Sequence, residues 1–163
     1  MKLERNTIGT LAEPVSQSDR CGTEFETQAS GVINAALVKN PSIAGAGTSN
    51  SNSSLQFRSG VTDPANGTIS ATVTGNSISN TNAGNTGGRF RAEALSVGAG
   101  AGNMCLDDLR NNALENASKE FELQDNSAAL GVVNLNQSGN TGTVTNTGAR
   151  AIGTVAPRPQ PGF

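Results

Sequence analysis

The sequence predicts an all-β protein, built as a β-solenoid of about four to five parallel rungs of 31–36 residues each. Three observations predict this fold. Two series of residues recur along the chain at similar periods, and apolar residues near them alternate with polar ones, as in strands. The chain also contains 20 Gly and 19 Asn, which suit many turns between short strands. A fixed period of this length is typical of repeat proteins, whose neighbouring units bury a common core.

Four of the five phenylalanines recur in similar settings, each between two long polar side chains. The spacings between them are 32, 33 and 31 residues. Neighbouring residues of a strand point to opposite faces, so each Phe is expected to face inward and its neighbours outward. We therefore predict an internal stack of Phe25, Phe57, Phe90 and Phe121, and an outer column of Glu26, Arg58, Arg91 and Glu122.

An asparagine recurs in a second series, with an aliphatic residue three positions before it and another within three positions after it. The spacings are 34, 36 and 36 residues. Asn tolerates the left-handed backbone conformation of a sharp bend, and its amide can donate to and accept from the rungs on either side. We expect Asn6, Asn40, Asn76 and Asn112 to stack at the bend after one strand of each rung, and a weaker fifth copy to end at Asn136.

The repeat region is expected to cover residues 1–148 and to be a piece of a longer solenoid, because natural solenoids cap their end rungs and neither terminus shows a cap. Open ends predict end-to-end self-association. The segment 149–163 contains three prolines, which cannot join a central ladder, so it is expected to be an exit linker or a capping strand. Cys21 and Cys105 are predicted to lie on different rungs as two unpaired thiols.

Two segments carry a resemblance to a known superfamily: SATVTGNSISNT (residues 70–81) and CLDDLRNN (residues 105–112). They resemble the right-handed parallel β-helix repeats of the pectate-lyase-like superfamily, and in particular the repeat regions of bacterial surface and adhesin-like proteins. The resemblance covers roughly residues 3–145 and implies a right-handed coil. The pair Asp107 and Asp108 departs from the alternation seen around Ala71, which predicts a β-bulge there.

The composition excludes several classes of partner. A pI near 5.1 with 11 Lys and Arg gives no basic surface for nucleic acid, and stacking aromatics are nearly absent. No apolar run approaches the roughly 18 residues that cross a bilayer. Residues 1–6 lack the apolar core of a secretory signal. The chain is therefore either cytosolic as it stands or cut from a longer exported protein, and we expect the second, with a location outside the cell or on its surface.

The acidic pair Asp107–Asp108 is the sharpest candidate for catalysis, since adjacent acids occur in β-helix hydrolases of the polygalacturonase type. Those enzymes also need a His, and this chain has none. Glycoside hydrolysis in general needs two carboxyl groups at a set separation, and Asp125 or Glu93 could partner Asp107. Polysaccharide lyases of this fold combine a Ca²⁺-binding acid cluster with a basic Arg or Lys. A solvated bulge and an ordinary charged sheet face are the competing interpretations, so no catalytic, cofactor or metal site is predicted.

Three hypotheses for function follow. The leading one is a non-catalytic structural or adhesive β-solenoid module of an exported cell-surface protein, with cell-surface glycans or further rungs of the parent protein as partners. The second is a carbohydrate-active β-helix, either a polysaccharide lyase, a glycoside hydrolase or a segment of a phage tail spike. The third is a mostly disordered linker. A groove with two close carboxylates, or an acid cluster with Arg, would favour the second.

Overall fold

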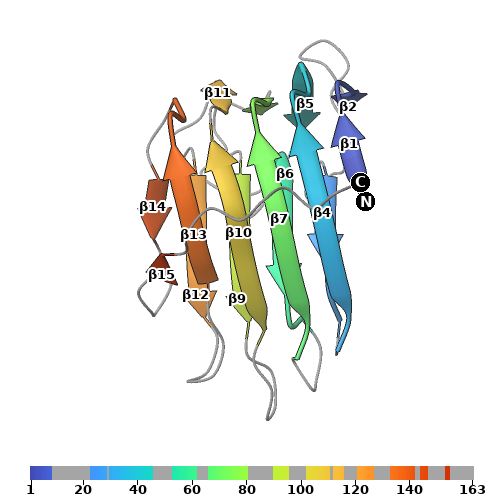
Figure 1. The fold of residues 1–163 in the computed structure, drawn as a ribbon, viewed down its shortest axis with the longest axis vertical. Coiled ribbons are helices and arrows are strands. Elements are labelled where there is room, and N and C mark those ends of the chain that lie inside the picture. Colours follow the sequence, from blue (N-terminus) through green and yellow to red (C-terminus); the bar gives the residue numbers. More distant parts are fainter. Residues whose placement is uncertain are drawn as a thin grey trace.

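The computed structural model describes residues 1–8, 23–28, 30–45, 53–61, 66–80, 90–95, 102–110, 112–115, 121–126, 133–141, 144–146 and 153–154. Every regular element in these ranges is a β-strand, and every strand pairs in parallel with its neighbours (Figure 1). The prediction of an all-β chain with parallel strands is therefore confirmed.

The strands form three sheets, which we call A, B and C. Sheet A has the order β1 (Lys2–Glu4), β4 (Val32–Val38), β7 (Thr68–Thr74), β10 (Asn103–Arg110), β13 (Val133–Ser138) and β15 (Gly153–Thr154). Sheet B has the order β2 (Thr7–Ile8), β5 (Ser42–Gly45), β8 (Ser77–Asn80) and β11 (Ala113–Glu115). Sheet C has the order β3 (Thr23–Glu26), β6 (Leu55–Ser59), β9 (Phe90–Leu95), β12 (Phe121–Asn126) and β14 (Val144–Asn146).

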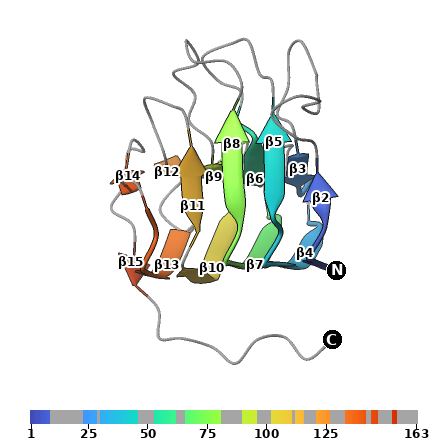
Figure 2. The same ribbon diagram turned by 90° about the horizontal axis from the view of Figure 1, so that it is seen from above.

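From β1 to β13 the chain visits sheets A, B and C in rotation, so that neighbouring strands of a sheet come from successive sequence repeats; the described strands that follow, β14 and β15, lie in sheets C and A. In Figure 1 the strands of sheet A lie in front of those of sheet C, and sheet B lies at the upper end of both; Figure 2 shows the same arrangement from above. Each parallel pair up to β13 is joined by a long connection that passes through the other two sheets, whereas only one described strand separates β12 from β14 and β13 from β15. The repeats found in the sequence thus lie side by side.

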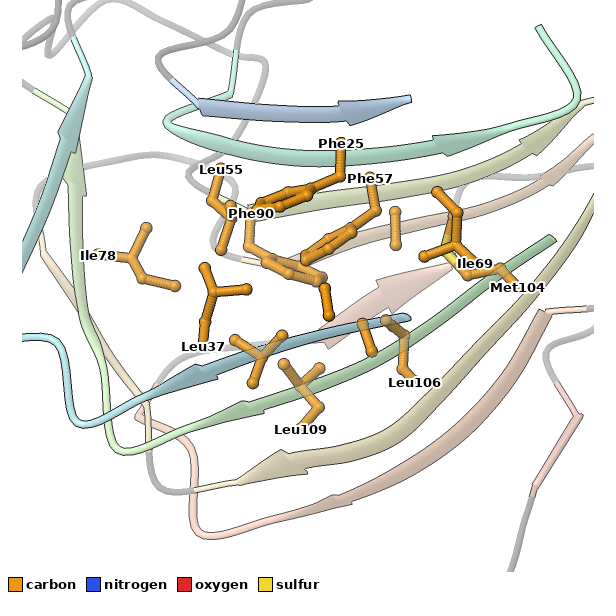
Figure 3. Close-up of a cluster of buried hydrophobic side chains, with 14 of the residues drawn as sticks. Phe25, Leu37, Leu55, Phe57, Ile69, Ile78, Phe90, Met104, Leu106 and Leu109 are labelled. Atoms are coloured by element: carbon orange, nitrogen blue, oxygen red, sulfur yellow. The ribbon is translucent and has the colours of Figure 1, made fainter. Parts of the chain in front are cut away.

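Apolar side chains from all three sheets share one interior (Figure 3). The rings of Phe25 and Phe57 stack with their centroids 4.9 Å apart, and those of Phe57 and Phe90 are tilted by 51° at 5.8 Å. All three are buried, so the predicted stack is confirmed for them. Phe121 pairs in register with Phe90, and its side chain lies outside the described part of the structure.

The register between the strands of sheet C does not place all the phenylalanines in a single column. Phe25 lies beside Phe57, but Phe57 lies beside Ala92 and Phe90 lies beside Leu55. A shift of two residues keeps every side chain on its original face, so the interior stays apolar although the column is offset. The spacing of the Phe residues therefore predicts the face correctly and the register between β6 and β9 wrongly.

The bend between sheets A and B places its left-handed residue one position earlier than expected. At this bend the positive φ angles belong to the residues immediately before Asn6, Asn40, Asn76 and Asn140, and not to the asparagines themselves. The bend therefore needs a residue that tolerates φ > 0, followed by an Asn whose side chain makes hydrogen bonds. The described residues with this role are Arg5 (φ 56°), Lys39 (φ 52°), Gly75 (φ 66°) and Gly139 (φ 64°).

Two further features of sheet A bear on the predictions. The pairing of β10 with β7 passes from Leu106–Ala71 to Asp108–Thr72, which leaves Asp107 as an extra residue and confirms the predicted β-bulge. At the end of the sheet, β15 lies inside the segment 149–163 and pairs with β13 at two residues. Cys105 lies half-buried in β10, while Cys21 lies outside the described residues.

A glycine precedes three strands of sheet A, a repeat that was not predicted from the sequence. Gly31, Gly67 and Gly102 stand directly before β4, β7 and β10, and the carbonyls of the first two accept hydrogen bonds from the N–H of Thr68 and Asn103. A Cβ on Gly67 would collide with the side chain of Thr27, and one on Gly102 with the backbone of Ser59. The corners at Gly67 and Gly102 are therefore too tight for any side chain.

Candidate functional site

Five buried or half-buried charged side chains gather on the outer face of sheet C, and we call them the outer-face charge cluster. They face away from the phenylalanines, since they alternate with the core residues along each strand. Each of the strands β3, β6 and β9 contributes at least one of them. They are Glu24, Glu26, Arg58, Arg91 and Glu93.

Arg58 lies at the centre of this cluster. Its Nε lies 3.1 Å from Oε2 of Glu93, and its Nη1 lies 3.4 Å from Oε2 of Glu26. The same Nη1 lies 3.8 Å from Oε1 of Glu24. Arg91 adds a second contact to Glu93, with its Nη2 3.4 Å from Oε1. The three carboxylates therefore all contact a guanidinium, and the two guanidiniums share Glu93.

The cluster corrects the predicted outer column of Glu26, Arg58, Arg91 and Glu122. The two-residue offset of β9 places Glu93 beside Arg58, and Arg91 beside Gln56. Opposite charges on neighbouring strands attract one another, whereas the predicted column would place Arg91 directly beside Arg58. Glu122 lies beside Arg91, so a second column runs through Glu24, Gln56, Arg91 and Glu122.

Three carboxylates considered for catalysis, Asp107, Asp108 and Glu93, do not belong to one site. Glu93 lies on β9 of sheet C and points outward, where it binds Arg58. Asp107 and Asp108 lie on β10 of sheet A, across the shared interior from β9 (Figure 1), and their side chains lie outside the described part of the structure. Glu93 thus faces away from sheet A, and the convergence of Glu93 with Asp107 is not observed.

Within the described ranges, no group of three or more His, Cys, Asp or Glu side chains could hold a metal ion. No helix in the same ranges is long and apolar enough to span a bilayer.

The Asn series forms a continuous ladder of hydrogen bonds at the bend between sheets A and B. The backbone N–H of each Asn donates to Oδ1 of the next one along the series, at 2.9, 3.0, 3.1 and 3.0 Å. From the second Asn onward, Nδ2 also donates to the next Oδ1, at 2.7, 2.9 and 2.9 Å. We call this set the Asn ladder: Asn6, Asn40, Asn76, Asn112 and Asn140.

Four of the five ladder residues were predicted, and the fifth was placed wrongly at Asn136. Asn136 lies within β13, whereas Asn140 follows that strand and lies only 28 positions after Asn112. The tripeptide Ser138-Gly139-Asn140 repeats the Thr74-Gly75-Asn76 pattern, with Gly at the left-handed position. That Gly-Asn pair is the signal that could have identified the fifth copy.

Comparison with known proteins adds no family to this description. No family model, no curated protein and no solved structure matches the sequence.

Proposed function

We propose that the chain is a right-handed parallel β-helix that acts as a non-catalytic structural or adhesive module of an exported cell-surface protein. The rotation of the chain through three parallel sheets supports the coiled path. The right-handed sense is the one that connections between parallel strands almost always take. The Asn ladder and the shared apolar interior both run from repeat to repeat, which is how a solenoid gains its stability.

The observation that carries the non-catalytic interpretation is the mutual pairing within the outer-face charge cluster. A general acid or base must reach a substrate and exchange a proton with it. Here the most buried carboxylate, Glu93, has both oxygens within 3.4 Å of a guanidinium nitrogen. Such pairs hold neighbouring repeats in register, which is a structural role.

A carbohydrate-active enzyme is the second candidate, because three carboxylates and two arginines do meet on one face. A lyase-type mechanism would use such a combination of acids and Arg near a bound acidic sugar. In that case Arg58 or Arg91 would have to leave Glu93 in order to act on a substrate.

The two proposals are separated by an assay on acidic and neutral polysaccharides. The purified chain and its Glu93→Gln variant are incubated with each polymer, with and without Ca²⁺, and new reducing ends and unsaturated sugar products are measured. The structural proposal expects no product from either protein, and any glycan retention to be equal for both. Product formation that Glu93→Gln abolishes would overturn it and establish the enzyme.

Export has its own test. Intact cells that produce the full-length parent protein are treated with a protease, and the β-helix region is then detected by antibody. Loss of the region from intact cells supports surface exposure, whereas protection until the cells are lysed would contradict it.

A further inference from the structure

The Asn ladder has a direction, because donors and acceptors are not equivalent along it. Each inner Asn accepts at Oδ1 from the repeat before it and donates to Oδ1 of the repeat after it. Its Nδ2 also donates backward, to the carbonyl three residues before the preceding ladder Asn. These backward bonds are Asn76 to Leu37 (3.0 Å), Asn112 to Val73 (2.8 Å) and Asn140 to Leu109 (2.7 Å).

Asn6 makes a different set of contacts from the inner residues. Its Nδ2 donates to the carbonyl of Glu4 within its own repeat, at 3.0 Å, instead of to an earlier repeat. Asn6 is exposed, whereas Asn40, Asn76 and Asn112 are buried. Its Oδ1 takes no donor within the described residues. This end of the ladder therefore presents an acceptor and a side chain that can rotate.

The other end of the ladder presents the matching groups. Asn140 is half-buried, and its backbone N–H occupies the position from which each earlier ladder Asn donates to the next Oδ1. Among the described residues of sheet A, β15 pairs with β13 at Asn134 and Leu135 only. The following residues of β13, Asn136 to Ser138, have no strand on that side among the described residues.

We propose that a second copy of this chain docks head to tail at these ends, with its β1 beside the open part of β13. The N–H of Asn140 then donates to Oδ1 of Asn6 in the second copy, and that Asn6 turns its Nδ2 from Glu4 to the carbonyl of Gln137. Within the chain, the residues two positions before each ladder Asn lie beside one another in sheet A. They are Glu4, Val38, Thr74, Arg110 and Ser138. The same rule places Glu4 of the second copy beside Ser138.

Head-to-tail docking is selected over head-to-head docking by the direction of the ladder. Two Asn6 ends would pair only with each other, and neither would meet the backbone N–H that donates to Oδ1 at every other step of the ladder. Head-to-tail docking also continues the parallel pairing of sheet A, and β1 needs only the three residues that β15 leaves open. A contact of this kind is heterologous, so it repeats and forms open-ended filaments. The inference rests on the stacked-repeat architecture proposed above.

Disulfide trapping tests the register directly. Glu4→Cys and Ser138→Cys are combined in a chain in which Cys21 and Cys105 are changed to Ser. Adjacent strands bring Cα atoms to about 5 Å, within disulfide range. We expect oxidation to give a series of covalent oligomers on a non-reducing gel. Lys2→Cys with Ser138→Cys is the matched control, because an offset of two residues puts the Cα atoms about 8 Å apart. Equal crosslinking of both pairs, or none in the first, overturns the proposal.

Asn6→Ala tests the ladder contact without damaging the fold. The only bond that Asn6 donates to Asn40 comes from its backbone N–H, which Ala retains. We expect this variant to weaken association in sedimentation velocity by about tenfold or more, since it loses at least one hydrogen bond at the junction. Asn66→Ala, at an exposed asparagine outside the ladder, should associate like the parent chain. Equal association of all three proteins contradicts the proposed contact.

Circular dichroism separates this inference from the proposed function. A parent chain that stays monomeric at high concentration with an intact β-signal overturns only the head-to-tail contact. A chain without a β-signal overturns the β-helix itself.

Discussion

Asn76 donates both its backbone N–H and its side-chain Nδ2 to one atom, Oδ1 of Asn112, at 3.1 and 2.9 Å. Both residues are about 1% exposed, so neither donor can turn to water instead. Asn112 in turn donates to the carbonyl of Val73 at 2.8 Å. Its Nδ2 also donates to Oδ1 of Asn140 at 2.9 Å, so a single amide satisfies groups in two repeats and ties the ladder to the backbone of sheet A.

Replacing Asn112 by Ala should therefore destabilise the fold strongly. The change leaves two buried donors of Asn76 and the carbonyl of Val73 without partners, and each such group costs about 1–3 kcal/mol. We expect the free energy of unfolding to fall by about 3–5 kcal/mol. Urea unfolding followed by circular dichroism measures it. Asn66→Ala at an exposed position is the control, and an equal loss in both variants would contradict the role of the ladder.

The sequence predicted the ladder residues better than it predicted the register between strands. An Asn with a specific hydrogen-bonding role leaves a visible mark, so four copies were found from their spacing alone. The fifth, Asn140, was missed because its repeat is only 28 residues long. The length of a connection does not determine how strands align, because a shift of two residues exposes the same face. For this reason the sequence did not predict the two-residue offset of Phe90, nor the pairing of Arg58 with Glu93 that results from it.

The bends of the ladder offer a paired test of backbone strain. Lys39 has φ 52° and Gly75 has φ 66° at equivalent positions of neighbouring repeats. A left-handed conformation costs a residue with a Cβ about 1–2 kcal/mol, part of which the greater chain entropy of Gly offsets. Lys39→Gly should therefore stabilise the fold by up to about 1 kcal/mol.

Gly75→Ala should destabilise the fold, by about 1 kcal/mol. The added Cβ would lie 3.4 Å from Cγ of Lys39, an ordinary contact, so the cost comes from the φ angle and not from a collision. Thermal unfolding of Lys39→Gly, Gly75→Ala and the parent chain shows whether each substitution raises or lowers the stability of the fold. Two shifts of the same sign would contradict the left-handed bend.

Replacing Phe57 should destabilise the fold more than replacing any other aromatic residue. It is fully buried and contacts both Phe25 and Phe90, whereas Phe25 is 7% exposed and lies on the edge strand β3. Phe57→Ala should lower the free energy of unfolding by about 3–5 kcal/mol through lost burial and the cavity left behind. Phe25→Ala should cost less, because the edge of the sheet can relax. Chemical unfolding compares the two, and a larger loss at Phe25 would contradict the shared interior.

The ion pair between Arg58 and Glu93 should contribute more than an exposed pair. The side chain of Glu93 is 7% exposed and that of Arg58 is 29% exposed, so water screens their contact only in part. A double-mutant cycle with Arg58→Met and Glu93→Gln should give a coupling of about 1–2 kcal/mol that persists in salt. The exposed pair Lys2–Glu4 should give a coupling that salt removes. Equal salt sensitivity of the two couplings would contradict the buried character of the cluster.

Glu4 should titrate below the ordinary range of a glutamate. The ammonium of Lys2 lies 2.8 Å from Oε2 of Glu4 and lowers its pKa, first by a hydrogen bond and then by charge attraction, with smaller contributions from Arg5 and Lys39. A carboxyl whose pKa is lowered in the folded chain stabilises the fold above its unfolded pKa. That stabilisation is lost as the pH falls through the folded pKa.

Lys2→Ala removes the principal cause of this pKa shift and should return the pKa of Glu4 towards its ordinary value. Carboxyl carbon shifts in an NMR titration of the parent chain and the variant report the change directly. The accompanying effect on stability should be small, because both side chains are more than one-third exposed and water screens their attraction. A pKa of Glu4 that does not move in Lys2→Ala would show that the Lys2 contact does not persist in solution.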